Sequence, residues 1–198
     1  MALNSLLFDE RKAGQAAAFL LHKAGGQLTV LKLIKLMYLA ERESLRRYGD
    51  TITGDSFVSM PHGPVTSAVL DHINDLLPSS DPRGWKFWVA DRADNNLALR
   101  EPGMVSNPEQ DLLALSETDL ECLDAVWTQF GGMSGFQLRE YTHGEGCPEW
   151  ENPNGSSRPI PMGKLLMALG YQPDQVSAII KRQHEQRYIN AAFHAAGS

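Results

Sequence analysis

The stretch Thr29–Tyr48, TVLKLIKLMYLAERESLRRY, decides how the rest of the chain is interpreted. Residues on a helix advance by about 100° per position, so the face that each one occupies follows from its number. The apolar residues of this stretch share one broad arc, which holds Val30, Leu33, Ile34, Met37, Leu45 and Tyr48. Gly49 follows directly and is a common helix stop. The pattern therefore predicts a long amphipathic helix that packs one face against a core.

An acidic residue, Glu41, lies near the centre of this apolar arc. A carboxylate there must be paired, hydrogen-bonded or protonated, because burying it bare costs several kcal/mol. The favoured interpretation is a structural acid that caps a neighbouring turn. The alternative is a general acid or base with a raised pKa.

Basic residues form a stripe on the opposite side of the same helix. The stripe consists of Lys32, Lys35, Arg42 and Arg46. One interpretation is an ordinary solvated face. The other is a contact surface for an acidic partner or for nucleic acid.

Outward from this helix, the remaining pattern is mostly helical. Ser116 with Asp119, and Ser134 with Gln137, each predict a capping box at a helix start. Trp85–Glu101, WKFWVADRADNNLALRE, has alternating apolar residues on both sides of Asn95-Asn96 and predicts a hairpin. The expected helices span about 9–24, 29–48, 64–77, 116–130, 134–142, 162–169 and 173–194, with a short strand at 56–60, a loop at 102–115 and a turn-rich stretch at 144–161.

These elements predict a mainly α fold with a small antiparallel β element, an α+β protein. We expect residues 1–198 to form a single compact helical domain with a hairpin, because no stretch resembles a linker long enough to separate two domains.

The composition limits the classes of function. A hydrophobic content of 42% argues for a globular protein. A net charge of −6 argues against a protein whose function depends on binding phosphate groups. Cys122 and Cys147 lie far apart with no CxxC motif, which fits a reducing cytoplasm. The first residues lack the pattern of a signal peptide, and no apolar run approaches the ~20 residues that cross a bilayer. We therefore expect a cytoplasmic protein without a membrane partner.

The string Met60-Pro61-His62-Gly63-Pro64-Val65 predicts a rigid corner between the short strand and the next helix. Each proline fixes its own φ and pushes its predecessor toward extended geometry, while Gly63 permits a strained link and Pro64 suits a first helical turn. Catalysis by His62 would need a base, a nucleophile or metal ligands, and the local sequence offers none. The corner is interpreted as structural.

A second histidine lies in Tyr141–Trp150, YTHGEGCPEW, where His143, Glu145 and Cys147 alternate. The His-x-Glu pattern occurs in zinc-dependent deaminases, which also need a Pro-Cys-x-x-Cys pair downstream. Here Cys147 precedes Pro148 and no second cysteine follows, so the zinc ligand set is incomplete. We interpret the segment as an ordered loop in which His143 ties down backbone groups and Trp150 anchors into the core.

Several segments, taken in order, resemble one family. They are Lys32–Glu41 (KLIKLMYLAE), Gly54-Asp55, Pro61–Val65 (PHGPV), Leu138–His143 (LREYTH) and Pro148-Glu149-Trp150. Together they resemble the Panacea domain, the SocA-like antitoxin domain that is common in prophages and bacterial toxin–antitoxin pairs. The resemblance spans about residues 10–170, and the predicted helix at 173–194 follows it. Extra residues between His143 and Trp150 depart from the pattern of the family.

The resemblance implies a cytoplasmic antitoxin that binds and neutralises a cognate toxin protein by direct contact. For SocA-like members it also implies a proteolysis adaptor that hands the toxin to a protease complex. It implies no catalytic residue, metal or cofactor, and it implies that the position of His62 does not require an imidazole. The resemblance assigns a structural role to the residues that match the family motif, which are Lys32, Tyr38, Glu41, Pro61, Gly63, Pro64, Thr142, His143 and Trp150.

Three functional hypotheses follow from the sequence. The first is the toxin-binding protein, whose candidate contact residues are Arg42, Arg46 and Arg47 on the basic stripe and Trp85 and Trp88 on the hairpin, with one of the two Trp side chains expected in the core. The second is a metal-dependent hydrolase or nucleotide-processing enzyme built on Glu41, His62, His143 and Glu145. The third is a DNA-binding repressor, against which the net charge and the lack of an appended DNA-binding module argue.

Overall fold

The computed structural model describes residues 7–196, with the backbone alone for residues 187, 190, 191 and 193–196. The described part is an α+β fold in which helices dominate, as predicted. Its elements in chain order are α1 (Glu10–Lys23), β1 (Gln27–Thr29), α2 (Val30–Tyr48), β2 (Phe57–Met60), β3 (Gly63–Thr66), α3 (Ser67–Ile73), α4 (Trp85–Trp88), β4 (Asn96–Ala98), α5 (Pro108–Asp111), α6 (Glu117–Phe130), α7 (Gly135–His143), β5 (Arg158–Pro159), α8 (Met162–Ala168) and α9 (Pro173–Ala196).

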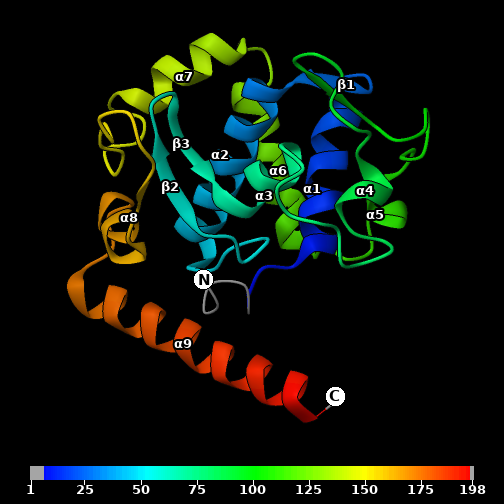
Figure 1. The fold of residues 1–198 in the computed structure, drawn as a ribbon. Coiled ribbons are helices and arrows are strands. Elements are labelled where there is room, and N and C mark those ends of the chain that lie inside the picture. Colours follow the sequence, from blue (N-terminus) through cyan, green and yellow to red (C-terminus); the bar gives the residue numbers. More distant parts are fainter. Residues whose placement is uncertain (1–6, 197–198) are drawn as a thin grey trace.

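Helix α2 lies at the centre of the molecule, as its apolar arc predicted (Figure 1). The Thr29 side chain accepts the backbone N–H of Lys32 and caps the start of the helix. Gly49 ends it in the left-handed conformation, with φ of 65°. Helices α1, α6 and α7 and strand β3 all pack against α2. The core of the protein therefore surrounds this one helix.

The capping predictions for two other helices are confirmed. Ser116 and Asp119 form a reciprocal capping box at α6, and Ser134 and Gln137 form another at α7. Each box satisfies backbone N–H groups that have no partner within the first helical turn. These short-range signals place both helices correctly to within a residue or two.

The β structure consists of two small antiparallel sheets in the described residues. Strand β1 pairs with β4, while β2 lies between β3 and β5. Neither β1 nor β5 was expected from the sequence, because both are very short and are defined by partners far along the chain.

The prediction of a strand-to-helix corner at Pro61–Pro64 is wrong in one respect. Pro61 and His62 form the turn of a β2–β3 hairpin, and Pro64 lies in β3, opposite Ser59. The following helix begins only at Ser67 and ends at Ile73. Apolar spacing after Pro64 suits either structure locally, and pairing with β2 decides for a strand.

The predicted hairpin at Trp85–Glu101 is only partly correct. Single bridges join Val89 to Leu99 and Ala93 to Asn96, but Trp85–Trp88 is a short helix. Residues three apart lie on opposite faces of a strand and on the same face of a helix. The helical form lets both Trp85 and Trp88 be buried, at 3% and 7% exposure, where α4 packs on α1.

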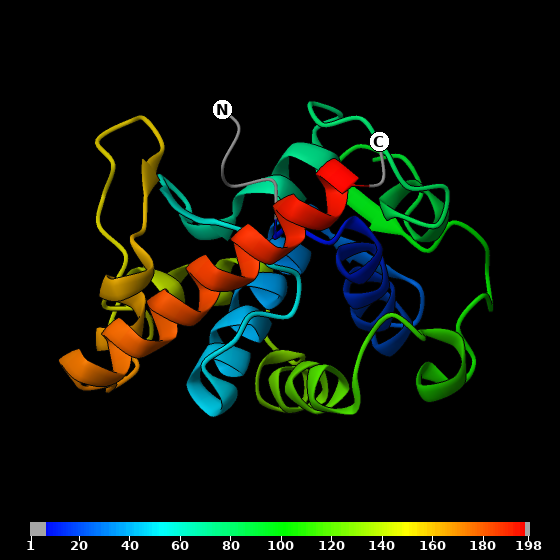
Figure 2. The same cartoon turned by 90° about the horizontal axis from the view of Figure 1, so that it is seen from below.

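Helix α8 lies at one side of the body, and α9 runs from there across its lower face (Figure 1 and Figure 2). Hydrogen bonds from Tyr171 and Arg182 tie this region to the end of α2. The Tyr171 hydroxyl donates to the carbonyl of Leu45 at 2.8 Å, and the Arg182 guanidinium donates to that of Gly49 at 2.6 Å. Within the described residues, none of the helices is both long and apolar enough to span a bilayer. The expectation about a signal peptide concerns the first residues, of which 1–6 lie outside the described part.

Candidate functional site

Several of the family-motif residues, although far apart in sequence, meet at one face of α2, whereas Lys32 and Glu41 lie elsewhere on this helix. This face contacts strand β3, helix α7 and the segment 147–150. The structure brings together these four parts of the chain through polar and ring contacts. We call this group of residues the motif cluster, and its members are Lys35, Tyr38, Arg42, Pro64, Thr142, His143, Glu149 and Trp150.

Glu149 is the charged centre of the motif cluster, and its side chain has no exposed area. It accepts a hydrogen bond from the Tyr38 hydroxyl at 2.6 Å and from Nε of Arg42 at 2.8 Å. Burial and the adjacent carboxylate raise the pKa of Tyr38 well above its ordinary value, so Tyr38 stays a donor. The arrangement neutralises a buried charge and fastens segment 147–150 to α2.

Lys35 is also completely buried, and its ammonium nitrogen lies 2.8 Å from the carbonyl oxygen of Pro64. Burial lowers the pKa of Lys35 to about 7. A Cβ atom added at Gly63 would lie 2.7 Å from this nitrogen and 2.8 Å from Oγ1 of Thr142. The lysine therefore fills the space that the absent side chain of Gly63 leaves.

His143 and Trp150 close the outer side of the motif cluster. Their rings stack with centroids 4.3 Å apart, and Nε1 of Trp150 donates to the carbonyl of Met60 at 3.1 Å. Burial, followed by the charges of Lys35 and Arg139, lowers the pKa of His143. Trp150 therefore holds the loop to β2 from a half-buried position rather than entering the core as expected, and His143 contributes a stacked ring.

Glu41 lies outside the motif cluster and holds the loop after α2. Its carboxylate accepts the backbone N–H groups of Ile52 at 2.7 Å and Thr53 at 2.9 Å, and also the Thr53 hydroxyl. The interpretation of Glu41 as a buried acid that caps a neighbouring turn is confirmed. Burial nevertheless raises the pKa of Glu41 to about 7, although these hydrogen bonds oppose the shift.

Asp55 has an equivalent structural role that the sequence did not reveal. Its two carboxylate oxygens accept the backbone N–H groups of Ala68 at 2.9 Å and Val69 at 3.0 Å. It therefore caps α3 from a distance, since Thr66 at the N-cap position makes no such bond. Burial raises the pKa of Asp55 to about 6.

The residues of the enzyme hypothesis do not form one site. Glu41 is committed to the loop at 52–53, His143 stacks on Trp150, and His62 and Glu145 are exposed. Among residues 7–196 no three His, Cys, Asp or Glu side chains gather as a metal would require. The two cysteines are unpaired and buried.

The basic stripe on α2 is neither the solvated face nor the continuous contact surface that the sequence left as its two interpretations. Lys35 and Arg42 belong to the motif cluster, so half of the stripe points into the protein. Lys32 donates to the carbonyl of Gly131 at 2.6 Å. Arg46, and with it Arg47, pairs with Glu43 at 2.7 and 2.6 Å. Charge periodicity alone could not show that three other elements cover this side of α2.

The prediction that Trp85 and Trp88 are contact residues also requires correction. Both Trp85 and Trp88 are core residues, whereas the sequence placed only one of them there. Their neighbour Phe87 is the exposed aromatic residue, with 46% of its surface accessible.

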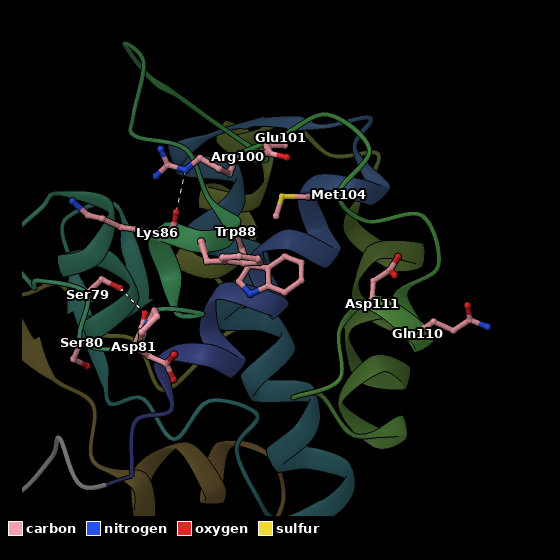
Figure 3. A pocket seen from close by; sticks show the side chains of 12 residues that line it. Ser79, Ser80, Asp81, Lys86, Trp88, Arg100, Glu101, Met104, Gln110 and Asp111 are labelled. Atoms are coloured by element: carbon pink, nitrogen blue, oxygen red, sulfur yellow. Dashed lines mark hydrogen bonds between the residues drawn. The ribbon is translucent and has the colours of Figure 1, made fainter.

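A groove of about 990 Å³ opens beside α4 (Figure 3). Trp88 lies at its centre, Ser79–Asp81 and Lys86 lie on one side, and Glu101, Met104 and the α5 residues Gln110 and Asp111 lie on the other. Sequence reasoning missed this groove because four separate segments line it. No spacing rule connects segments that only the tertiary structure brings together.

Comparisons with known proteins identify the family. No curated protein and no solved structure shows significant similarity to the chain. The family model for the SocA-like antitoxin, Panacea domain, matches residues 33–151. This match runs from α2 to the end of segment 147–150 and contains every member of the motif cluster. The chain therefore belongs to the SocA-like antitoxin family that is defined by the Panacea domain.

Proposed function

We propose that this protein is an antitoxin that neutralises a cognate toxin protein by direct contact. Membership of the SocA-like antitoxin family is the observation that carries this proposal. An antitoxin family favours a binding role over an enzymatic one.

The use of the motif residues inside the fold supports a binding role. Lys35, Tyr38 and Glu149 are buried and bonded to other parts of the chain, so they stabilise the scaffold. Binding then falls to exposed side chains around this scaffold, among which Arg46 and Arg47 remain candidates. A rigid scaffold with a few anchoring side chains is the usual basis of a tight protein–protein contact.

Co-expression with the product of the neighbouring gene tests the proposal. We expect that product to stop growth when it is expressed alone, growth to resume when this protein is co-expressed, and the two purified proteins to elute together from a sizing column. A neighbouring product that is harmless alone, or that remains toxic beside this protein, would contradict the antitoxin function.

The lifetime of the toxin separates simple blocking from adaptor action. If this protein only blocks the toxin, the tagged toxin persists in a stable complex after protein synthesis is stopped. If it also delivers the toxin to a protease, as the family resemblance implies for SocA-like members, the toxin disappears faster in its presence. A protease-deficient host should then restore the lifetime of the toxin.

A further inference from the structure

The grooves on either side of α5 form one continuous region of the surface. One is the groove of Figure 3, and the second, of about 970 Å³, lies between α5, α1 and α6. Gln110 of α5 lines both grooves. We call the two grooves together the α5 surface.

Each groove combines apolar walls with a rim of charge. Phe87 and Met104 contribute apolar area to the groove of Figure 3, and Phe19 and Leu120 contribute it to the second groove. Phe87 is exposed and packs edge-on against Trp88 with ring centroids 5.1 Å apart, so its ring is held in place. An exposed aromatic side chain that is already ordered is a favourable binding anchor, because little side-chain entropy is lost on contact.

The cations of the α5 surface are all neutralised by neighbouring carboxylates. Lys86 pairs with Asp75 at 3.0 Å and Arg100 lies 3.6 Å from Asp91. In the second groove, the pairs are Lys23 with Asp124 at 2.6 Å and Arg47 with Glu43 at 2.6 Å.

Some carboxylates of the same surface are not paired with a cation among the described residues. Glu101, Glu109 and Glu117 are exposed, and none of them forms an ion pair within residues 7–196. Glu101 lines the groove of Figure 3, while Glu109 and Glu117 line the second groove. Free negative charge therefore borders both grooves, and free positive charge borders neither in the described part of the chain.

We propose that the α5 surface docks a basic segment of the toxin, one that carries several Arg or Lys side chains and at least one large apolar side chain. The apolar side chain packs against Phe87 and Met104, and the cations meet Glu101, Glu109 and Glu117. This inference rests on the proposed antitoxin function and adds the surface and the charge class of the partner. Complementary charge of this kind speeds association and makes binding sensitive to salt.

The test measures the affinity of the purified protein for the product of the neighbouring gene. The first variant combines Glu101→Gln, Glu109→Gln and Glu117→Gln, and the second is Phe87→Ala. The control variant removes three exposed carboxylates elsewhere, through Glu145→Gln, Asp174→Asn and Glu185→Gln. The net charge of the triple variant and of the control is the same, −6 + 3 = −3. All of these positions are exposed, and thermal unfolding confirms that each variant folds.

We expect the triple variant and Phe87→Ala each to weaken binding at least about tenfold, and the control to stay within about twofold of the wild type. The dependence of affinity on salt should also be shallower in the triple variant than in the control. Wild-type affinity in both groove variants would overturn the assignment of the α5 surface while the antitoxin function stands. If the wild type itself neither binds nor neutralises that product, the proposed function fails, and this inference fails with it.

Discussion

Gly63 is the single residue on which the motif cluster depends most directly. Its φ of 94° lies in the region that favours glycine, and a Cβ atom there would overlap with Lys35 and Thr142. Gly103 provides a matched comparison, since its φ is 76° but no atom lies within 4 Å of the position of a Cβ.

We predict that Gly63→Ala lowers the free energy of unfolding by about 3 kcal/mol, and Gly103→Ala by about 1 kcal/mol. Both variants carry the conformational penalty, but only the first also forces atoms apart in a packed interior. Urea unfolding of the two variants measures the difference. Equal losses would mean that the space around Gly63 has no energetic importance.

Glu41 makes the stability of the protein depend on pH. Because burial raises its pKa to about 7, the folded protein keeps this proton at pH values where the unfolded chain, with a pKa of 4.5, has lost it. The folded state then binds more protons between these two values, so the free energy of unfolding falls as the pH rises through that window. The stabilisation that Glu41 provides through its raised pKa is complete below its pKa in the unfolded chain. It is lost above its pKa in the folded protein. Asp55, with its pKa raised to about 6, acts in the same direction.

We predict that Glu41→Gln removes a part of the pH dependence of stability, so that the free energy of unfolding falls less, or rises more, from pH 5 to pH 7 in this variant than in the wild type. Glu43→Gln is the control, because the bond from Arg46 holds the pKa of Glu43 below its ordinary value and leaves it ionised across the window. Urea unfolding at the two pH values provides the measurement. A pH difference that Glu41→Gln leaves unchanged would contradict the raised pKa.

Side-chain hydrogen bonds and an ion pair fasten segment 147–150 to α2. The segment has no regular secondary structure, yet the hydroxyl of Tyr38 and the guanidinium of Arg42 both reach Glu149 within it. Losing one donor leaves a buried carboxylate less well satisfied.

We predict that Tyr38→Phe lowers the free energy of unfolding by about 2 kcal/mol. Tyr141→Phe also removes one hydroxyl, but no hydrogen bond to that hydroxyl occurs in the described structure, so it should change stability by less than about 0.5 kcal/mol. Chemical unfolding of the two variants compares them. Similar losses in both would argue that the Tyr38–Glu149 bond adds nothing to stability.

The first half of helix α9 packs against the body of the protein. Val176 is buried and Ile179 and Ile180 pack against the core, whereas Tyr188 and Ile189 are exposed. The hydroxyl of Tyr171, just before α9, adds the bond to Leu45.

We predict that Tyr171→Phe accelerates amide hydrogen exchange in α9 about fivefold relative to exchange in α6. Tyr188→Phe removes a hydroxyl from a side chain that is 77% exposed, and it should leave exchange in both helices unchanged. Exchange followed by mass spectrometry resolves the two helices. A uniform change across α6 and α9 would show that α9 is not attached through this contact.

At the scale of the whole molecule, the hydrophobic core extends beyond the residues that the family model matches. The matched residues 33–151 leave out α1, whose Ala13, Ala17 and Leu20 are completely buried. Helix α1 packs on α2, α4 and α6, so it completes the core of the matched region. We propose that the chain folds as one domain that includes α1.

We predict that far-ultraviolet circular dichroism and tryptophan fluorescence report the same urea midpoint. The four tryptophans lie in α4, in α6 and in segment 147–150, while the helices of the whole chain dominate the dichroism. Coincident transitions are the mark of two-state unfolding. Separate midpoints would divide the molecule into independently stable parts.

Local signals predicted the helices well, because each depends on residues a few positions apart. The caps at Ser116 and Ser134 and the stop at Gly49 are of this kind. The same signals failed at Pro64 and at Trp85–Trp88, where apolar spacing is compatible with helix and strand alike. Pairing with β2 in one case, and burial against α1 in the other, decided the outcome.

By itself, the sequence determined the central amphipathic helix, the buried and hydrogen-bonded state of Glu41, and membership of the family, because each follows from a pattern within a short stretch or from motifs in a given order. Only the tertiary structure decided that Lys35 and Arg42 point inward, that the Pro64 carbonyl and Glu149 are their respective partners, and that two grooves flank α5. These features depend on contacts between segments up to about a hundred positions apart, for example Arg42 and Glu149, which are separated by 107. The free energy of such contacts comes from packing and desolvation in the assembled core, which no short stretch of sequence contains.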